Sequence, residues 1–274
     1  MPDAIFADPR LAQIYDWMES ERSDLDAYVA MAQEFEARSV LDVGCGTGTL
    51  CLLLAAAGLD VVGVDPAEAS LDVARSKRGA AKVQWISGDA KQLPPMQVDL
   101  AFMTANVAQV FLSDDEWNET LKSIHAVLKP GGRFIFETRN PACQAWLGWN
   151  REQTEAVATI PGVGEVTGWC ELVNVDEPFV SFRWTYEFVE SNETITSEST
   201  LRFRSKLEVE HSLVAHRFAI EESRDVPDRP GLEFVFVARS KWEEENVTSG
   251  SRLPRPGRHK FPTSGSRSDV RSYR

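Results

Sequence analysis

Apolar residues between positions 40 and 137 recur in short runs that polar and turn-forming residues separate. Five of these runs have the length of a strand: residues 40–43, 59–64, 83–87, 98–103 and 133–137. Apolar residues at helical spacing lie between them, at 50–57 and 117–128, and Ser113 and Glu116 form a capping box that opens the second helix. Strands that alternate with helices predict an α/β domain with a parallel sheet.

The flanking segments have patterns of their own. Apolar spacing predicts two helices before the first strand, within 11–18 and 25–32, with a break near 20–23. Strict alternation at 180–188 predicts a strand with one buried face, which a return strand at 194–204 follows. Residues 172–175 pair alongside them, so we expect an antiparallel layer inserted after the fifth strand.

The last part of the predicted domain contains a helix and two strands. A second capping box, Ser205 to Glu208, opens a helix that runs to about Ala215. Residues 218–223 and 232–239 are the sixth and seventh strands, and Pro230-Gly231 lies in the turn before the seventh.

Composition and charge narrow the function. The 274 residues are 43% hydrophobic, which allows a full core. The net charge of −13 argues against electrostatic binding to nucleic acid or to an anionic membrane. Residues 246–274 differ, with seven basic residues and one acidic residue in a Ser-, Pro- and Gly-rich segment. We expect a disordered tail there, and an arm for an anionic partner is the alternative.

Several other classes of site are disfavoured. The four cysteines show no C-x-x-C spacing, so we expect neither a metal site nor a disulfide framework. No run approaches the ~20 apolar residues of a membrane helix. The N-terminus lacks the basic start and apolar run of a signal peptide, so we expect a cytoplasmic protein with no membrane partner. The sequence carries no signal for an oligomeric state.

Candidate chemistry begins at the end of the first strand. Asp42, Gly44, Gly46 and Gly48 stand at alternate positions, and a helix follows them. Glycines let the backbone turn sharply and approach a ligand, and the helix that follows presents free N–H groups. A dinucleotide fingerprint would have a third Gly where Thr49 stands.

Each of the next strands also ends in polar residues. Asp65 ends the second strand roughly 20 positions past the glycines, where a carboxylate can accept both ribose hydroxyl hydrogens. Pro66 follows and directs the chain into the first turn of a helix. The third strand leads into Gly88-Asp89-Ala90 and the fourth into Thr104-Ala105-Asn106.

This order of elements resembles motif I and the following motifs of the class I S-adenosylmethionine (SAM) methyltransferases, over residues 40–138. The resemblance implies a Rossmann-like, doubly wound α/β fold with seven strands, the last antiparallel, and an inserted antiparallel β layer after strand 5. It divides one methyltransferase domain, 1–245, into N-terminal cap helices (1–38), a SAM-binding core (39–139), an inserted β cap (about 140–204) and a closing helix with two strands (205–245). Residues 246–274 stay outside it.

The resemblance also assigns SAM as the cofactor and a set of residues to it: Tyr15, Asp42, Gly44, Cys45, Gly46, Asp65, Pro66, Gly88, Asp89, Ala90, Thr104 and Asn106. Asp65 is expected on the ribose and Asp89 near the adenine amino group. Tyr15 belongs to an Ile-Tyr-Asp run that reaches the site in similar enzymes, and an ordinary helix-face aromatic is the alternative. We expect Cys45 to fill the turn as a small residue rather than to act as a thiol.

The expected reaction is direct in-line transfer of the methyl group from SAM to a small-molecule acceptor. Such a displacement requires alignment and exclusion of water, and we assign no catalytic base. Glu137 and Arg139 lie near the expected crevice, with a surface ion pair as the alternative. The inserted layer either covers the acceptor or extends the sheet as a dimer surface.

The sequence leaves three other functions open. One is a protein or nucleic-acid methyltransferase that the basic tail recruits, although the chain lacks the Asn/Asp-Pro-Pro-aromatic tetrad of the DNA amino-methylating enzymes. Another is a non-catalytic SAM-binding regulator. The third is a nicotinamide dehydrogenase, which Thr49 disfavours.

Overall fold

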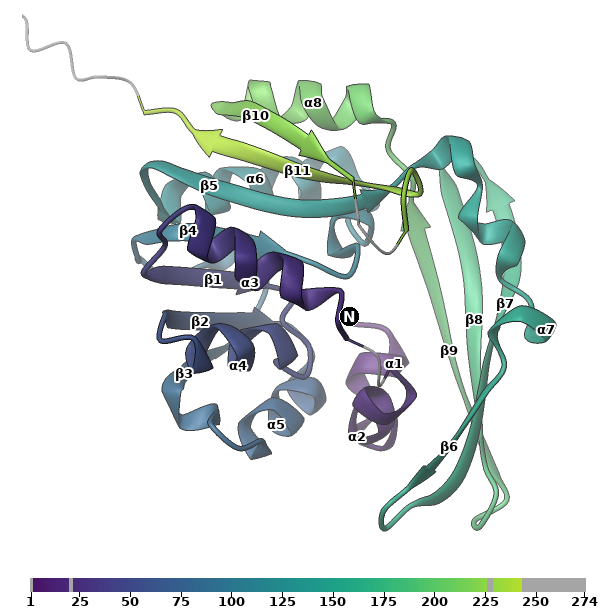
Figure 1. Cartoon of the computed structure of the whole chain (residues 1–274). Helices are drawn as coiled ribbons and strands as arrows, with labels where there is room; N and C mark the ends of the chain where they lie inside the picture. The colour runs from purple at the N-terminus through teal and green to yellow at the C-terminus, as the bar shows by residue number, and fades with distance from the viewer. Residues whose placement is uncertain (1, 20–21, 226–228, 243–274) are drawn as a thin grey trace, which may run out of the picture. The chain divides into compact units, whose positions relative to one another are not determined.

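The computed structural model describes residues 2–19, 22–225 and 229–242 (Figure 1). Its main sheet has seven strands: β1 (Ser39–Val43), β2 (Asp60–Asp65), β3 (Val83–Ser87), β4 (Val98–Met103), β5 (Leu128–Arg139), β10 (Phe218–Arg224) and β11 (Glu233–Ser240). Their order is β10-β11-β5-β4-β1-β2-β3. β11 runs antiparallel to both of its neighbours, whereas β1 to β5 pair in parallel. The predicted fold class is confirmed.

Helices cover both faces of this sheet because its strands are apolar on both sides. The longer helices are α3 (Leu25–Glu34), α4 (Thr49–Ala56) and α5 (Glu68–Ser76) on one face, and α6 (Asp114–Val127) and α8 (Lys206–Ala215) on the other. In β5, Phe134 and Phe136 join the core under α6 and α8, while Ile135 joins the core under α3 and α4. Both predicted capping boxes are confirmed, at Ser113 and Ser205.

A second sheet follows β5, as expected, but it is larger than the sequence indicates. It contains four antiparallel strands in the order β6 (Ala156–Ile160), β7 (Gly164–Asp176), β8 (Phe179–Phe188) and β9 (Glu193–Arg202). β6 was not predicted, because most of its side chains are exposed and it has no alternation. The predicted strand at 172–175 is the end of the longer β7, and the return strand ends at Arg202 rather than at 204.

Short helices connect the longer elements. They are α1 (Ala4–Ala7), α7 (Arg151–Thr154), and the 3-10 helices η1 (Ala80–Lys82), η2 (Ala90–Gln92), η3 (Val107–Gln109), η4 (Pro141–Cys143) and η5 (Ala145–Gly148). α5 begins at Glu68 after the N-cap residue Ala67, so Pro66 precedes the helix and does not lie in its first turn. Arg217 takes the left-handed conformation, φ 65°, at the corner after α8.

The N-terminal helices α1 and α2 (Pro9–Met18) contact α5, which covers the main sheet, and the strands β6 and β9 of the inserted sheet (Figure 1). The Ile5 N–H donates to Ser197 Oγ of β9 at 2.9 Å. On the other side, the Ser70 hydroxyl of α5 donates to the Phe6 carbonyl at 2.9 Å. This helix pair therefore connects the inserted sheet to the first half of the main sheet.

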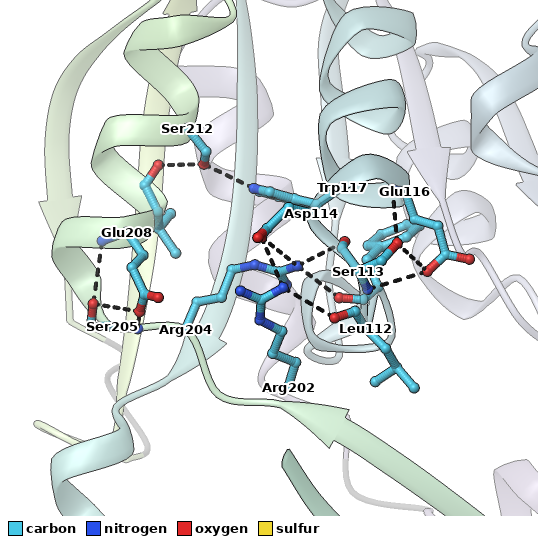
Figure 2. A network of polar contacts seen from close by, with 12 residues as sticks. Leu112, Ser113, Asp114, Glu116, Trp117, Arg202, Arg204, Ser205, Glu208 and Ser212 are labelled. Atoms are coloured by element: carbon cyan, nitrogen blue, oxygen red, sulfur yellow. Dashed lines mark hydrogen bonds and ion pairs between the residues drawn. The ribbon is translucent and has the colours of Figure 1, made fainter. Parts of the chain in front are cut away.

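The other end of the inserted sheet is attached to the start of α6, as Figure 2 shows. Arg204 Nη2 donates to the carbonyls of Phe111 and Ser113, at 2.8 and 3.2 Å. Arg202 pairs with Asp114 at 2.8 Å and also donates to the Leu112 carbonyl. Burial lowers the pKa of Arg204 to about 10. These contacts fix the segment that leads from β4 into α6.

Candidate functional site

The glycine loop between β1 and α4 has the backbone that its sequence predicts. Gly44, Gly46 and Gly48 have φ values of 73°, 51° and 78°, which L side chains rarely adopt. The N–H groups of Gly44 and Cys45 donate to the Val64 carbonyl at 2.9 and 3.2 Å, so the loop is bound to the end of β2. Gly48 is the N-cap residue of α4, and no side chain caps that helix.

The three glycines differ in what surrounds them. A Cβ on Gly44 would lie 2.7 Å from Val107 in the segment after β4, and one on Gly48 would overlap the Trp85 ring. A Cβ on Gly46 would meet nothing within 4 Å, and the same holds for Gly88 at the end of β3. The space beside the loop is therefore open at Gly46 and Gly88.

Asp65 binds the backbone at the middle glycine of this loop. Its side chain is 8% exposed, and its two oxygens accept from the N–H groups of Gly46 and Ala67, each at 2.8 Å. Burial raises the pKa of this carboxyl, and the two backbone donors oppose the shift. Because a carboxylate oxygen has two lone pairs, each oxygen can accept one further hydrogen bond.

Asp42 lies deeper, at the end of β1. Cys51 Sγ donates to its Oδ2 at 3.3 Å, and its Oδ1 is buried without a partner in the described residues. Burial raises the pKa of Asp42 to about 7. Cys45 and Cys51 are both free and buried.

The third predicted acidic position is more exposed. Asp89 accepts from the Lys91 N–H at 2.9 Å and pairs with Lys91 Nζ at 3.2 Å, with 47% of its side chain exposed. Ala90 is buried beside it, and the Gly88 N–H donates to the Asp65 carbonyl at 3.0 Å. β2 and β3 thus end side by side, and an adenine role for Asp89 stays a prediction.

The N-terminal helix reaches the glycine loop through a residue that sequence reasoning missed. Asp16 accepts from the Thr47 hydroxyl at 2.6 Å and pairs with Lys77 at 2.5 Å. Its neighbour Tyr15 packs against Phe6, with ring centroids 5.8 Å apart, and burial raises the Tyr15 pKa to about 12. The contact to the loop therefore comes from the third residue of the Ile-Tyr-Asp run.

A second polar group, here called the acceptor cluster, lies where β4 and β5 end and β11 begins. It consists of Tyr28, Asn106, Glu137, Arg139 and Glu233. Asn106, Glu137 and Glu233 are each 3% exposed. Glu137 accepts from the Tyr28 hydroxyl and, at 3.2 Å, from the Asn106 N–H. Burial raises the pKa of Glu137, and the nearby Glu233 raises it further.

Glu233 connects this cluster to the seventh strand. It lies opposite Arg139 in the register of β11 and β5, and its Oε1 accepts from Asn106 Nδ2 at 3.1 Å. Arg229 Nη1 also donates to this oxygen, at 3.0 Å, whereas Arg139 Nε lies 3.8 Å from it. Neither Glu137 nor Arg139 therefore forms the simple surface ion pair that was the alternative for both.

Three neighbours complete the surroundings of the cluster. Arg139 donates to Gln109 Oε1 at 3.2 Å, and its guanidinium lies 5.8 Å from the centre of the Trp149 ring. Thr104, just after β4, is 8% exposed. Burial lowers the pKa of Arg139. Polar residues from four separate parts of the chain thus meet beside the segment that contacts Gly44.

The described residues place a histidine away from this site and contain neither a metal-binding group nor a membrane-spanning helix. His216, the C-cap residue of α8, is a titratable residue that lies before β10 at the amino-terminal edge of the sheet, opposite the glycine loop and away from the site. The residues that the structure describes contain no group of three His, Cys, Asp or Glu side chains that could hold a metal ion. No described helix has the length and apolar character to cross a membrane.

Comparison with known families and structures gives consistent matches. A family model described as a methyltransferase domain matches residues 40–132. A cypemycin N-terminal methyltransferase from Streptomyces is 34% identical over 146 residues, which are 52% of this chain and 60% of that protein. A ubiquinone/menaquinone biosynthesis C-methyltransferase from Rubrivivax gelatinosus is 36% identical over 121 residues, 44% of this chain and 46% of that protein. The chain thus spans about half the length of the curated relatives it matches.

Solved structures extend the similarity in fold. A SAM-dependent methyltransferase from Clostridium acetobutylicum has a TM-score of 0.67 at 18% identity, covering 85% of this chain and 98% of that one. An amino pentose methyltransferase from Micromonospora echinaspora, solved with SAM bound, has a TM-score of 0.63 at 18% identity, covering 84% and 97%. The similarity in fold therefore extends well beyond residues 40–132.

Proposed function

We propose that this chain is a class I, Rossmann-like SAM-dependent methyltransferase and that it transfers a methyl group from SAM to a small-molecule acceptor. The observation that carries the proposal is the pairing of an open, left-handed Gly46 with the buried Asp65 carboxylate, whose oxygens each keep a free lone pair.

The residues at the glycine loop fit SAM. Gly46 and Gly88 leave space for a ligand next to the backbone, and Asp65 offers one acceptor position to each of the two ribose hydroxyls. The N-terminus of α4, which no side chain caps, presents backbone N–H groups that suit a carboxylate. Asp16 and Thr47 hold the N-terminal helix against this loop.

The bound cofactor supplies a methyl group that is already activated by a sulfonium. This chain's residues then have to orient the acceptor and exclude water from it. Asn106 and Glu233 are buried beside the segment that packs under Gly44, so they suit the acceptor side of the reaction. The Asn106 N–H donates to the Glu137 carboxylate, and this bond fixes the backbone at Asn106.

A small-molecule acceptor is the better of two candidates. The names of the similar proteins include an amino pentose methyltransferase and a didemethyltoxoflavin N1-methyltransferase, and both acceptors are small. Recruitment of a protein or nucleic acid by the basic segment 246–274, which lies outside the described residues, is the second candidate.

The test is conversion of SAM to S-adenosylhomocysteine by the full chain and by a chain that lacks residues 246–274, across a panel of small amines, alcohols, thiols and acids. We expect at least one small acceptor to be methylated, at the same rate by both chains. Turnover that requires the tail and a macromolecular acceptor would replace this proposal with the second candidate.

A further inference from the structure

The acceptor cluster contains two buried hydrogen-bond acceptors that no described residue satisfies. Asn106 Oδ1 and Glu233 Oε2 are both closed off from solvent and have no hydrogen-bond partner among the described residues. An unsatisfied buried polar group costs about 1–3 kcal/mol, and buried polar groups are normally paired. Two such atoms on neighbouring side chains therefore indicate a binding partner that donates hydrogen bonds.

The two side chains act as one unit. Asn106 Nδ2 donates to Glu233 Oε1 at 3.1 Å, so the unpartnered atoms are the remaining oxygens of one hydrogen-bonded pair. The other contacts hold this pair in place: Arg229 donates to the same Glu233 oxygen, and Glu137 accepts from the Asn106 N–H. The free oxygens are thus positioned by a network that satisfies most of the other polar atoms around them.

The backbone at Asn106 places this pair next to the glycine loop. Ala105 and Asn106 are consecutive non-glycine residues with positive φ, 54° and 59°, and such conformations persist where the surroundings impose them. The next residue, Val107, fills the space that a side chain at Gly44 would need. Asn106 therefore directly precedes the residue that packs against the loop to which we assign the cofactor.

The chemistry of the free atoms selects the acceptor. A hydroxyl group has one donor hydrogen, whereas a primary amine has two and its ammonium has three. One of the two unpaired oxygens, Glu233 Oε2, belongs to a carboxylate, which favours a positively charged donor. Resting on the proposed function, we propose that Glu233 and Asn106 bind the amino group of the acceptor, so that this chain methylates an amine nitrogen. Gln109 Nε2, a buried donor also without a partner in the described residues, would bind an oxygen of the same molecule.

The transfer step balances with these residues. An acceptor that binds as an ammonium first loses one proton to the Glu233 carboxylate, which frees the nitrogen lone pair. This lone pair forms the new N–C bond as the C–S bond breaks, and that bond's electron pair stays on sulfur. The proton that the nitrogen releases passes to the Glu233 carboxylate and from there to solvent. Because both free oxygens are closed off from solvent, acceptor binding requires a local opening of this region, and water is excluded once it closes.

The test uses binding rather than turnover. The full chain is saturated with S-adenosylhomocysteine and titrated by calorimetry with matched pairs of amines and alcohols, such as cyclohexylamine with cyclohexanol and an amino sugar with its parent sugar. We expect amines to bind roughly tenfold or more tightly than their alcohols, since a site with unpaired polar atoms rejects a ligand that leaves them unpaired. Glu233→Gln should abolish this preference while S-adenosylhomocysteine affinity stays unchanged.

Glu187→Gln is the control for the same chemical change, because Glu187 is an exposed residue of β8 and does not belong to the acceptor cluster. It should keep the preference for amines. The proposal is overturned if no amine is preferred across the panel, or if folded Glu233→Gln protein keeps the preference. Loss of S-adenosylhomocysteine binding by the unaltered chain would instead overturn the proposed function.

Discussion

The two halves of the site are built from the chain in different ways. The half that we assign to the cofactor takes most of its polar and glycine positions from one continuous stretch, Asp42 to Asp65, in which two strands and a helix follow one another. The acceptor cluster takes Tyr28, Asn106 and Glu233 from α3, from the segment after β4 and from the start of β11. Only folding brings those three together.

This difference decides what a sequence can reveal. A continuous strand–turn–helix unit has fixed internal geometry, so residue spacing predicts which side chains meet. The acceptor cluster depends on β11 entering antiparallel beside β5, which places Glu233 opposite Arg139. The halves should therefore respond to separate substitutions, and the following predictions test that separation.

The largest effect is expected at Asp65. Asp65→Ala removes the carboxylate that binds Gly46 and that we assign to the ribose, so affinity for S-adenosylhomocysteine should fall about 100-fold or more, roughly 2.7 kcal/mol. Calorimetric titration measures this. Asp60→Ala, at the exposed start of the same strand, is the control and should bind normally. Near-normal affinity in folded Asp65→Ala protein would remove Asp65 from this role.

Tyr28 tests the other half. Tyr28→Phe leaves a buried Glu137 oxygen without its donor, so the free energy of unfolding should fall by about 1–3 kcal/mol. Affinity for S-adenosylhomocysteine should not change. Urea unfolding compares it with Tyr186→Phe, a buried tyrosine of the inserted sheet whose hydroxyl has no described hydrogen bond and which should lose much less. A joint loss of stability and cofactor affinity would contradict the separation of the halves.

Gly46 separates backbone strain from ligand contact. Gly46→Ala and Gly131→Ala both place a side chain at positive φ in open space, so each should cost about 1–2 kcal/mol of stability. Gly131 lies near the start of β5, at the end of the sheet opposite the glycine loop. Only Gly46→Ala should also weaken S-adenosylhomocysteine binding, by roughly tenfold. Equal affinities in the two variants would show that no ligand approaches Gly46.

The smallest effect is a pH dependence at Asp42. Its folded-state pKa is raised to about 7 from 3.8, so the folded protein binds a proton that the unfolded chain has released. The free energy of unfolding should therefore decrease as the pH rises from 5 to 7 and level off above it. Asp42→Asn should reduce this decrease by on the order of 1 kcal/mol. Identical pH profiles for both proteins would show that Asp42 ionises normally.

Much of the fold, and the geometry of the glycine loop, could be predicted from the sequence. The five strands from β1 to β5 are confirmed, because apolar periodicity and glycine turns encode them locally. The antiparallel direction of the seventh strand, which the family resemblance implied, is also confirmed. β6 escaped prediction because its exposed side chains follow no period, and α1 because four residues are too few to show one. Asp16 and Glu233 escaped because their partners are distant in sequence, although the Ile-Tyr-Asp run pointed near Asp16.

The central claim is that the glycine loop and Asp65 bind SAM. The most direct test is calorimetric titration of the full, folded chain with SAM, with S-adenosylhomocysteine and with NAD. We expect SAM and S-adenosylhomocysteine to bind and NAD not to bind. Binding of NAD, or of neither SAM nor S-adenosylhomocysteine, would contradict it.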